Sequence, residues 1–265
     1  SDTSHVVGRD VEMDALMHEF DRAVRGKGRL VAISADAGMG KTRLMDEFLR
    51  QLADRDQPVR VGRGRCSERL AGTEAYLPVL EALDSLQQNE QLGSLSRLIR
   101  ALAPSWYVQI MPPSDNESSA ERLAADTVSG SQERLKREIG MLLEEVARMS
   151  PVVLCFDDVH WADPSTTDLM GYLARRIDST RLMIIATARP SELAQTKHAF
   201  LPMKLDLLSR GMCREITPAS LRIEDVARYL ALRFSEHSFP AAFSSILHDR
   251  TEGNPLFMSD LVRDL

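Results

Sequence analysis

The sequence of 265 residues lacks any apolar run long enough to cross a membrane, and its first twenty residues are charged without an apolar core. It has three cysteines, Cys66, Cys155 and Cys213, which are widely spaced and follow no metal-binding pattern. These absences argue against a membrane protein and against a cysteine-bound metal. We therefore expect no signal peptide, no membrane partner and a reducing, cytoplasmic setting, in which Cys155 serves as core packing.

The composition is that of an ordinary globular chain, with 43% hydrophobic and 27% charged residues. The formal net charge of −6 argues against broad nucleic-acid binding by this segment. The length allows one large α/β domain, or such a domain with a small helical one. We expect the second arrangement.

The first chemical signal is a small-residue turn between a strand and a helix. Residues 35–42 read Ala-Asp-Ala-Gly-Met-Gly-Lys-Thr, after the apolar run 30–33 and before a helical pattern that starts at Leu44. In this context small residues let backbone N–H groups surround phosphate oxygens, Lys41 reaches the β- and γ-phosphates, and Thr42 can ligate Mg²⁺. The alternative is an ordinary strand–turn–helix corner with a surface lysine.

Two carboxylates follow a second apolar run. Residues 152–156 are all apolar and are bounded by Pro151, which is typical of a strand buried on both faces of a parallel sheet. Ligands of open α/β sheets bind at the carboxyl ends of strands, so we expect Asp157 to hold Mg²⁺ and Asp158 to orient or activate the attacking water. The alternative is a helix cap or a solvated turn.

A third candidate is Arg189, which follows the predicted strand 181–187 in the segment Ala188-Arg189-Pro190. We expect its guanidinium to be buried beside the phosphate-binding loop (P-loop) of residues 35–42 and to contact a γ-phosphate. The alternative is a surface arginine before a proline. His160 also follows the carboxylates. For His160 we favour loop packing over a direct contact with phosphate or water.

The apolar pattern predicts alternating strands and helices, followed by helices alone. An N-terminal helix should turn Val11, Leu16, Phe20 and Val24 toward one face. The predicted strands span residues 29–34, 59–63, 151–157, 181–187 and 213–216. The predicted helices include a segment to about residue 53 and residues 76–103, 131–149, 221–234, 241–249 and 255–265; Asp163 should cap a further helix, and residues 112–120 should be a mobile loop. We therefore predict an α/β fold with a P-loop nucleotide-binding domain over residues 1–217 and a helical lid over residues 218–265.

Five phrases occur together in a characteristic order. They are Val-Val-Gly-Arg-Asp at 6–10, Ala-Gly-Met-Gly-Lys-Thr-Arg-Leu at 37–44, Asp-Asp-Val-His-Trp-Ala-Asp-Pro-Ser-Thr at 157–166, Ala-Thr-Ala-Arg-Pro at 186–190 and Glu-Gly-Asn-Pro-Leu-Phe at 252–257. Over nearly its whole length the chain resembles the nucleotide-binding module of STAND-class P-loop ATPases. It looks most like the AAA-type module of large bacterial LuxR-type transcriptional regulators and of cyclase-linked signalling proteins.

The resemblance assigns a role to each matching residue. It implies that Asp158, Lys41 and Arg189 are catalytic, that Thr42 and Asp157 hold Mg²⁺, and that Gly253, Asn254 and Pro255 form a lid motif. The implied nucleotide-binding residues are Gly8, Arg9, Gly38, Met39, Gly40, Lys41, Thr42, Arg43 and Pro255. Two positions depart from the pattern: Ala35 replaces the usual first glycine, and Asp158 is shorter than the glutamate of fast ATPases.

The expected function is that of a switch. We expect the chain to bind ATP or ADP with Mg²⁺, to be a weak Mg²⁺-dependent ATPase and to form part of a longer regulator. Its partners would be the other domains of that protein and, in a nucleotide-dependent way, further copies of itself. Two alternatives are a P-loop small-molecule phosphotransferase, which the motif at 252–257 argues against, and a nucleotide-binding interaction module that does not hydrolyse.

Overall fold

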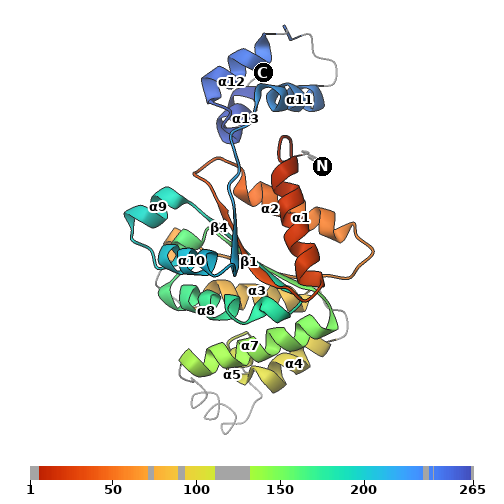
Figure 1. The fold of residues 1–265 in the computed structure, drawn as a ribbon, viewed down its shortest axis with the longest axis vertical. Helices are drawn as coiled ribbons and strands as arrows, with labels where there is room; N and C mark the ends of the chain where they lie inside the picture. Colours follow the sequence, from red (N-terminus) through yellow and green to blue (C-terminus); the bar gives the residue numbers. More distant parts are fainter. Residues whose placement is uncertain are drawn as a thin grey trace, which may run out of the picture.

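The structure is a computed structural model that describes residues 6–70, 75–88, 93–110, 132–234, 239–240 and 242–263. A five-stranded parallel sheet stands at the centre with helices on both faces, and three further helices form a separate group at one end of the molecule (Figure 1). This confirms the predicted α/β fold. The strands are β1 (Arg29–Ser34), β2 (Arg60–Arg65), β3 (Val152–Asp157), β4 (Leu182–Ala188) and β5 (Cys213–Ile216).

The order of the strands determines which loops meet at the carboxyl ends of the sheet. The order is β2-β3-β4-β1-β5, so that β4 lies between β1 and β3, and every neighbouring pair is parallel. The register pairs Ser34 at the end of β1 with Ala188 at the end of β4. Because all strands run the same way, the segments that follow β1, β3 and β4 leave the sheet together.

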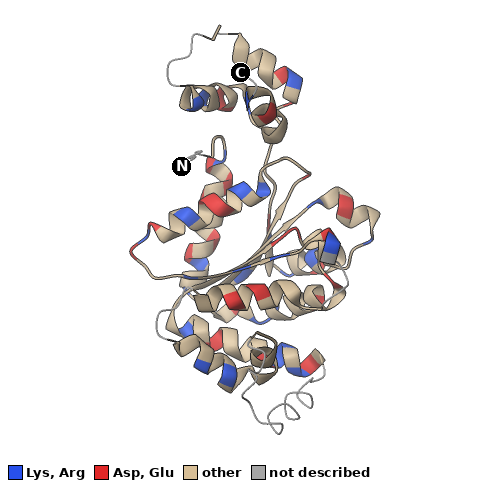
Figure 2. Ribbon diagram, turned by 180° about the vertical axis from the view of Figure 1, so that it is seen from behind, with Lys and Arg blue, Asp and Glu red and all other residues tan. Residues whose placement is uncertain are grey.

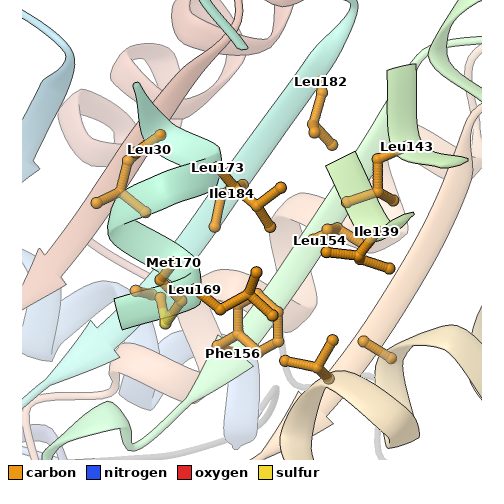
Figure 3. Packing of buried hydrophobic residues seen from close by; sticks show 14 of the residues in the cluster. Leu30, Ile139, Leu143, Leu154, Phe156, Leu169, Met170, Leu173, Leu182 and Ile184 are labelled. Carbon is orange, nitrogen blue, oxygen red and sulfur yellow. The ribbon is translucent and has the colours of Figure 1, made fainter. Parts of the chain in front are cut away.

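Each central strand is apolar on both sides. Leu154 and Phe156 of β3 point into one core and Val153 and Cys155 into the other, because successive side chains of a strand face opposite ways. Figure 3 shows the first core, where Leu169 and Leu173 of a covering helix pack over the strands. A sheet buried on both faces needs such continuous apolar runs. The three cysteines are buried and unpaired, as expected of packing residues.

Helices cover the two faces unequally. One face is covered by α1 (Asp10–Val24) and α2 (Lys41–Ala53). The other face and the layer behind it contain α3 (Leu77–Gln88), α4 (Ser94–Leu102), α5 (Pro104–Ile110), α7 (Gln132–Met149), α8 (Pro164–Ala174), α9 (Pro190–Gln195) and α10 (Phe200–Ser209). Short 3₁₀ turns lie at Glu68–Leu70, Val159–Trp161 and Ile177–Ser179. The Asp163 side chain caps α8 by accepting a hydrogen bond from the Thr166 N–H at 2.9 Å, as predicted.

Several element predictions need correction. Val11 is 79% exposed, because the buried face of α1 is set by Met13, Leu16, Phe20 and Ala23. Strand β2 runs two residues further than predicted, to Arg65. Its glycines allow close approach of α3, since a Cβ on Gly64 would lie 1.8 Å from the Pro78 carbonyl oxygen. The proposed loop at 112–120 lies outside the described residues.

The three separate helices share a small core of their own. They are α11 (Ile223–Arg233), α12 (Phe243–Thr251) and α13 (Pro255–Arg263). Leu221, Val226, Leu230, Leu247, Met258 and Val262 form this core. Phe239 packs against Phe234 and Phe243, with ring centroids 5.5 and 4.6 Å apart. We call this three-helix group the lid; residues 217–222 join it to β5.

Charges of both signs are interspersed along the helices seen in Figure 2. Many are paired along one helix, as in the contact of Arg50 with Glu47 at 2.6 Å. Such exposed pairs add little to stability. Within the described ranges, none of the helices combines the length and the apolar character that a membrane crossing requires.

Candidate nucleotide-binding site

The loop between β1 and α2 has the backbone of a phosphate cradle. Gly38 and Gly40 have φ angles of 80° and 81°, in the region that favours glycine, and α2 begins directly afterwards at Lys41. The N–H groups of a helix start are unpaired donors that attract anions. Ala35 is not among the residues with positive φ, so the first position of this loop does not require glycine.

The Lys41 side chain is held inside the loop. It is buried, with 6% of the residue exposed, and its Nζ donates to the carbonyl oxygens of Ala35 at 2.7 Å and Asp36 at 3.0 Å. Burial, and after it the positive charge of Arg189, lowers the pKa of the Lys41 amine, while nearby carboxylates oppose this. The positive charges of Lys41 and Arg189 therefore act on each other, and a bound anion would relieve this repulsion.

Asp157 at the end of β3 collects two hydroxyl groups. Thr42 Oγ1 donates to its Oδ2 at 2.9 Å, and the Thr187 hydroxyl of β4 donates to Oδ1. Asp157 is buried, with 8% exposure, and Thr187 is fully buried. The carboxylate thus links the helix after β1 to the strand that separates β1 from β3.

Asp158 turns the chain sharply after β3. Its φ of 55° and ψ of 47° lie in the left-handed region, which costs a residue other than glycine roughly 1 kcal/mol. The turn is fixed by its backbone N–H, which donates to Thr187 Oγ1 at 2.8 Å. Strained backbone of this kind is common at functional sites. The left-handed turn directs the chain at Asp158 away from the axis of β3.

Arg189 follows β4 and differs from the prediction. Its side chain is 31% exposed rather than buried, and Nη1 donates to Glu192 Oε1 at 2.6 Å. The pairing arises because α9 starts at Pro190, which places Glu192 one helical turn after Arg189. The backbone beside Arg189 contacts the P-loop, since the Ala35 N–H donates to the Ala188 carbonyl at 3.2 Å.

His160 lies behind these carboxylates in the 3₁₀ turn after β3. Its side chain is fully buried, and Nε2 lies 3.8 Å from Asp158 Oδ1 and 3.4 Å from Glu192 Oε2. Neither ring nitrogen has a hydrogen-bond partner. Burial lowers the pKa of the ring, which favours the neutral form.

The donor set fits a nucleotide with Mg²⁺. The Thr42 hydroxyl and the Asp157 carboxylate supply the oxygen ligands that Mg²⁺ prefers. Among the described residues, no group of three or more His, Cys, Asp or Glu side chains could hold a metal alone. In phosphoryl-transfer sites Mg²⁺ takes its remaining ligands from phosphates and water. The positive-φ glycines and the buried Lys41 amine fit the phosphates.

A small cavity lies between the P-loop, the N-terminal segment and the lid. Its volume is about 60 Å³, below the roughly 300–1,000 Å³ of typical ligand pockets. It is lined by Val6, Val7, Arg9, Met39, Gly40, Arg43, Leu221, Tyr229, Pro255, Met258 and Ser259. The fold thus brings five of the predicted nucleotide-binding residues into one place. Gly8 is not in the lining; a Cβ there would lie 2.5 Å from Asp225 Cγ of α11.

The lid touches the P-loop directly. The Leu256 N–H of α13 donates to the Gly38 carbonyl at 3.2 Å, and Asn254 Nδ2 lies 3.5 Å from the Ala37 carbonyl oxygen. Asn254 Oδ1 also accepts from the Leu256 N–H at 3.0 Å and so caps α13. Loop and lid are therefore joined through main-chain atoms.

Arg9 bridges the same parts from the other side. This residue is 5% exposed; Nη2 donates to the Met39 carbonyl at 3.1 Å, and Nη1 donates to the carbonyl of Ala219 in the connection to the lid. Glu12 of α1 completes the contact, with Oε1 3.2 Å from Arg9 Nη1. One guanidinium therefore ties the P-loop to the base of the lid.

The motifs assigned no role to several residues of this site, among them Thr187, Glu192 and Tyr229. A threonine in the otherwise apolar β4 is a visible signal for the first. Glu192 lies one turn after Arg189, where a carboxylate beside a proposed phosphate sensor could have been noticed. Tyr229 of α11 has no local signal, because only the packing of the lid brings it to the cavity.

A parallel sheet with a P-loop after β1 and a carboxylate after β3 defines a P-loop nucleoside triphosphatase. The family described as AAA ATPase domain matches residues 5–185, and the chain belongs to it. This confirms the P-loop ATPase module that the motifs indicated. A curated relative, an uncharacterized protein of Rhizobium meliloti (strain 1021), is 26% identical over 97% of this chain. The chain spans 24% of that relative's length.

Solved structures share the fold at low identity. The Walker-type ATPase of Pyrococcus abyssi aligns with a TM-score of 0.53 at 15% identity, over 96% of this chain and 65% of that one. The Orc1 protein of Aeropyrum pernix in complex with DNA gives 0.55 at 14%, over 98% and 59%. A Signal Transduction ATPase with Numerous Domains (STAND) protein with a tetratricopeptide repeat sensor, from Pyrococcus horikoshii, gives 0.52 at 16%, over 96% and 29%.

Proposed function

We propose that this chain is an ATP-binding, slowly ATP-hydrolysing switch module of a larger signalling or transcriptional regulator. The observation that carries the proposal is the contact between lid and P-loop: the Leu256 N–H donates to the Gly38 carbonyl at 3.2 Å. A ligand that enters the P-loop must meet the lid as well. Such a ligand shifts the equilibrium between two positions of the lid, and the size of the shift is set by the difference in its binding free energy for the two positions.

The residues divide the work of holding the nucleotide. We assign the phosphates to Lys41 and to the N–H groups around Gly38 and Gly40, and the base to the cavity beside Arg9 and Pro255. Thr42 and Asp157 would hold Mg²⁺, which neutralises charge on the phosphates when bound.

Hydrolysis would use the two groups beyond the P-loop. The oxygen of a water bonds to the γ-phosphorus while the bond from that phosphorus to the bridging oxygen of ADP breaks. Asp158 takes the proton of the water, and Arg189 stabilises the charge that develops on the phosphoryl oxygens. We propose a slow reaction, because the aspartate side chain is one methylene shorter than a glutamate and reaches less far from its backbone.

The role in a larger protein rests on the length of the relative. Since the chain spans 24% of that relative, we propose that other domains of the same polypeptide are its partners and read the lid. Nucleotide-dependent self-association is the second proposed output. Although one neighbour is in complex with DNA, the net charge of −6 leads us to propose that this segment itself binds none. We place it in the cytoplasm, with residues 1–217 and 218–265 as its two domains.

A calorimetric titration with ATP, ADP and GTP, each with Mg²⁺, tests the proposal. We expect binding of the adenine nucleotides in preference to GTP, and slow phosphate release from ATP without any added acceptor. Binding without release would favour the non-hydrolysing module. Release that appears only with a small-molecule acceptor would favour the phosphotransferase. A chain that binds none of the three nucleotides would overturn the proposal.

A further inference from the structure

A buried histidine without hydrogen bonds stands between two carboxylates of the candidate site. The His160 side chain has no exposed surface, and neither Nδ1 nor Nε2 has a partner. Its Nε2 faces Asp158, which follows β3, and Glu192, which belongs to α9. Because buried polar atoms without partners are rare in folded proteins, such a ring calls for an explanation.

Glu192 offers its two carboxylate oxygens to two different residues. Oε1 accepts from Arg189 Nη1 at 2.6 Å, whereas Oε2 lies 3.4 Å from His160 Nε2 and has no hydrogen-bond partner. The side chain is 25% exposed. One carboxylate therefore lies between the proposed γ-phosphate sensor and the ring that faces Asp158.

The segment that carries Glu192 is fastened to the P-loop. The Ala35 N–H donates to the Ala188 carbonyl at 3.2 Å, and Ser191 Oγ donates to Asp36 Oδ1 at 2.8 Å. Pro190 starts α9 with a fixed φ, which limits how far the next turn can move. The backbone that leads to Glu192 is thus fixed at Ala188 and Ser191 by groups that belong to the phosphate loop.

We propose that Glu192 is a positioning residue with two tasks. One oxygen holds the Arg189 guanidinium until a triphosphate competes for it, and the other, 3.4 Å from His160 Nε2, attracts the ring so that the same Nε2 stays against the Asp158 carboxylate and limits where that carboxylate lies. This inference rests on the proposed function. Both carboxylates face Nε2, at 3.4 Å for Glu192 and 3.8 Å for Asp158, so the single N–H of a neutral imidazole at this atom is attracted by both charges.

The proposal has a signature that general damage to the site does not produce. Glu192→Gln removes the charge but keeps the shape of the side chain. The ion pair with Arg189 is therefore lost, and so is the negative charge that faces His160 Nε2. We expect ATP to bind about fivefold tighter while ADP affinity stays within about twofold, since coupling of this size is at the low end of linked sites. Turnover should fall about tenfold, because small misplacement of a reacting group is costly. A merely structural role would weaken both nucleotides.

A matched control exists on α7. Arg148 and Glu145 form the same pair at the same spacing, at 2.8 Å, on an exposed surface. Glu145→Gln should leave both affinities and turnover at the values of the parent chain. Thermal unfolding of each variant without nucleotide checks that the fold is kept.

Two substitutions of His160 test the second half of the chain of contacts. His160→Gln can place an amide N–H where Nε2 now lies, whereas His160→Asn is too short to do so. We expect the glutamine variant to keep most of the turnover and the asparagine variant to lose about tenfold, with neither changing the ratio of ATP to ADP affinity. In the double variant that combines His160→Asn with Glu192→Gln, turnover should fall no further than in the more impaired of the two single variants.

The outcomes separate this inference from the proposed function. If the parent binds ATP but Glu192→Gln keeps the parent's ratio of ATP to ADP affinity, the task of holding Arg189 is wrong. If His160→Gln and His160→Asn behave alike, or if losses in the double variant add, the task of orienting Asp158 is wrong. A parent that binds no nucleotide would overturn the proposed function, and this inference with it.

Discussion

The Thr42 hydroxyl donates to the Asp157 carboxylate, with Oγ1 2.9 Å from Oδ2, although 115 positions separate the two residues. Thr42 lies in the first turn of the helix that follows one strand, and Asp157 ends another strand that is not a neighbour of the first in the sheet. The two oxygen groups proposed to hold Mg²⁺ are therefore in contact before any ion arrives. This preorganisation means that ion binding requires little rearrangement of the protein.

The first prediction concerns Asp157. Asp157→Asn should keep the hydrogen bonds to the two hydroxyl groups but remove the charge that attracts the metal. We expect ATP affinity in the presence of Mg²⁺ to fall by about tenfold or more, the effect of losing a charge-assisted contact of roughly 1.5–3 kcal/mol. With EDTA in place of Mg²⁺, parent and variant should bind ATP alike. Calorimetry in both buffers measures this, and an equal loss in both buffers would contradict the metal assignment.

Asp158 should behave differently from its neighbour. Asp158→Asn removes the proton acceptor while keeping the left-handed turn, which asparagine tolerates. Single-turnover phosphate release should slow by about 10²–10⁴-fold, the usual worth of a general base. Calorimetric affinity for ATP with Mg²⁺ should stay within about twofold, since the proposed task arises in the transition state. Phosphate release at the parent rate would remove Asp158 from the site.

Lys41 is the cation inside the phosphate loop. Lys41→Met keeps much of the buried stem but loses the amine that now bonds the Ala35 and Asp36 carbonyls. Triphosphate affinity should fall by at least about tenfold, because a contact of this kind is worth roughly 1.5–3 kcal/mol. Lys27→Met, in the turn before β1, is the control. Parent-like ATP binding by the Lys41 variant would contradict the assignment of the P-loop.

The sequence predicts the centre of this fold better than its periphery. The bounds of β1 and β5 match the expected residues 29–34 and 213–216. Strand β1 is buried from Leu30 onward, and a strand buried on both faces needs such an apolar run. Strand β5 lies at an edge of the sheet and alternates less clearly, with Arg214 exposed between the buried Cys213 and Ile216. Helices α9 and α10 were not predicted. Helix α9 has only six residues, and Pro202 interrupts the helical pattern of α10. Lys204 of α10 is also buried, paired with Glu215, so polarity misleads there.

The candidate site divides along the same line. Lys41, Thr42 and Asp157 come from local motifs whose spacing is visible in the chain. The contact of Thr187 with Asp157 could be placed only after the order of the strands was known, because β4 lies between β1 and β3. Contacts that depend on strand order leave no local periodicity behind.

Gly38 and Gly40 allow a direct test of the contact between loop and lid. Both have φ near +80°, but a Cβ on Gly38 would lie 2.8 Å from Asn254 Oδ1 and 2.9 Å from Leu256 Cβ, whereas a Cβ on Gly40 meets nothing within 4 Å. Each alanine variant should lose roughly 1–2 kcal/mol of stability through backbone strain. Gly38→Ala alone should speed hydrogen exchange at the Leu256 amide in the absence of nucleotide. Equal exchange in the two variants would show that the lid does not rest on Gly38.

The last prediction concerns Pro255, the first residue of α13 and part of the cavity lining. Proline has a fixed φ and no N–H, so it presents a rigid apolar face without an unpaired donor. Pro255→Ala should keep the Asn254 cap but loosen the lid, and should speed nucleotide release while leaving the P-loop intact. Stopped-flow displacement of a fluorescent ADP measures that rate. Pro104, at the start of α5 and on the far side of the molecule from the lid, is the matched control (Figure 1).

In the parent, ATP should protect amides at both 35–45 and 250–258 from exchange, because the ligand would bridge two bodies. Protection confined to 35–45, with release unchanged in Pro255→Ala, would leave a P-loop domain whose lid does not respond to nucleotide.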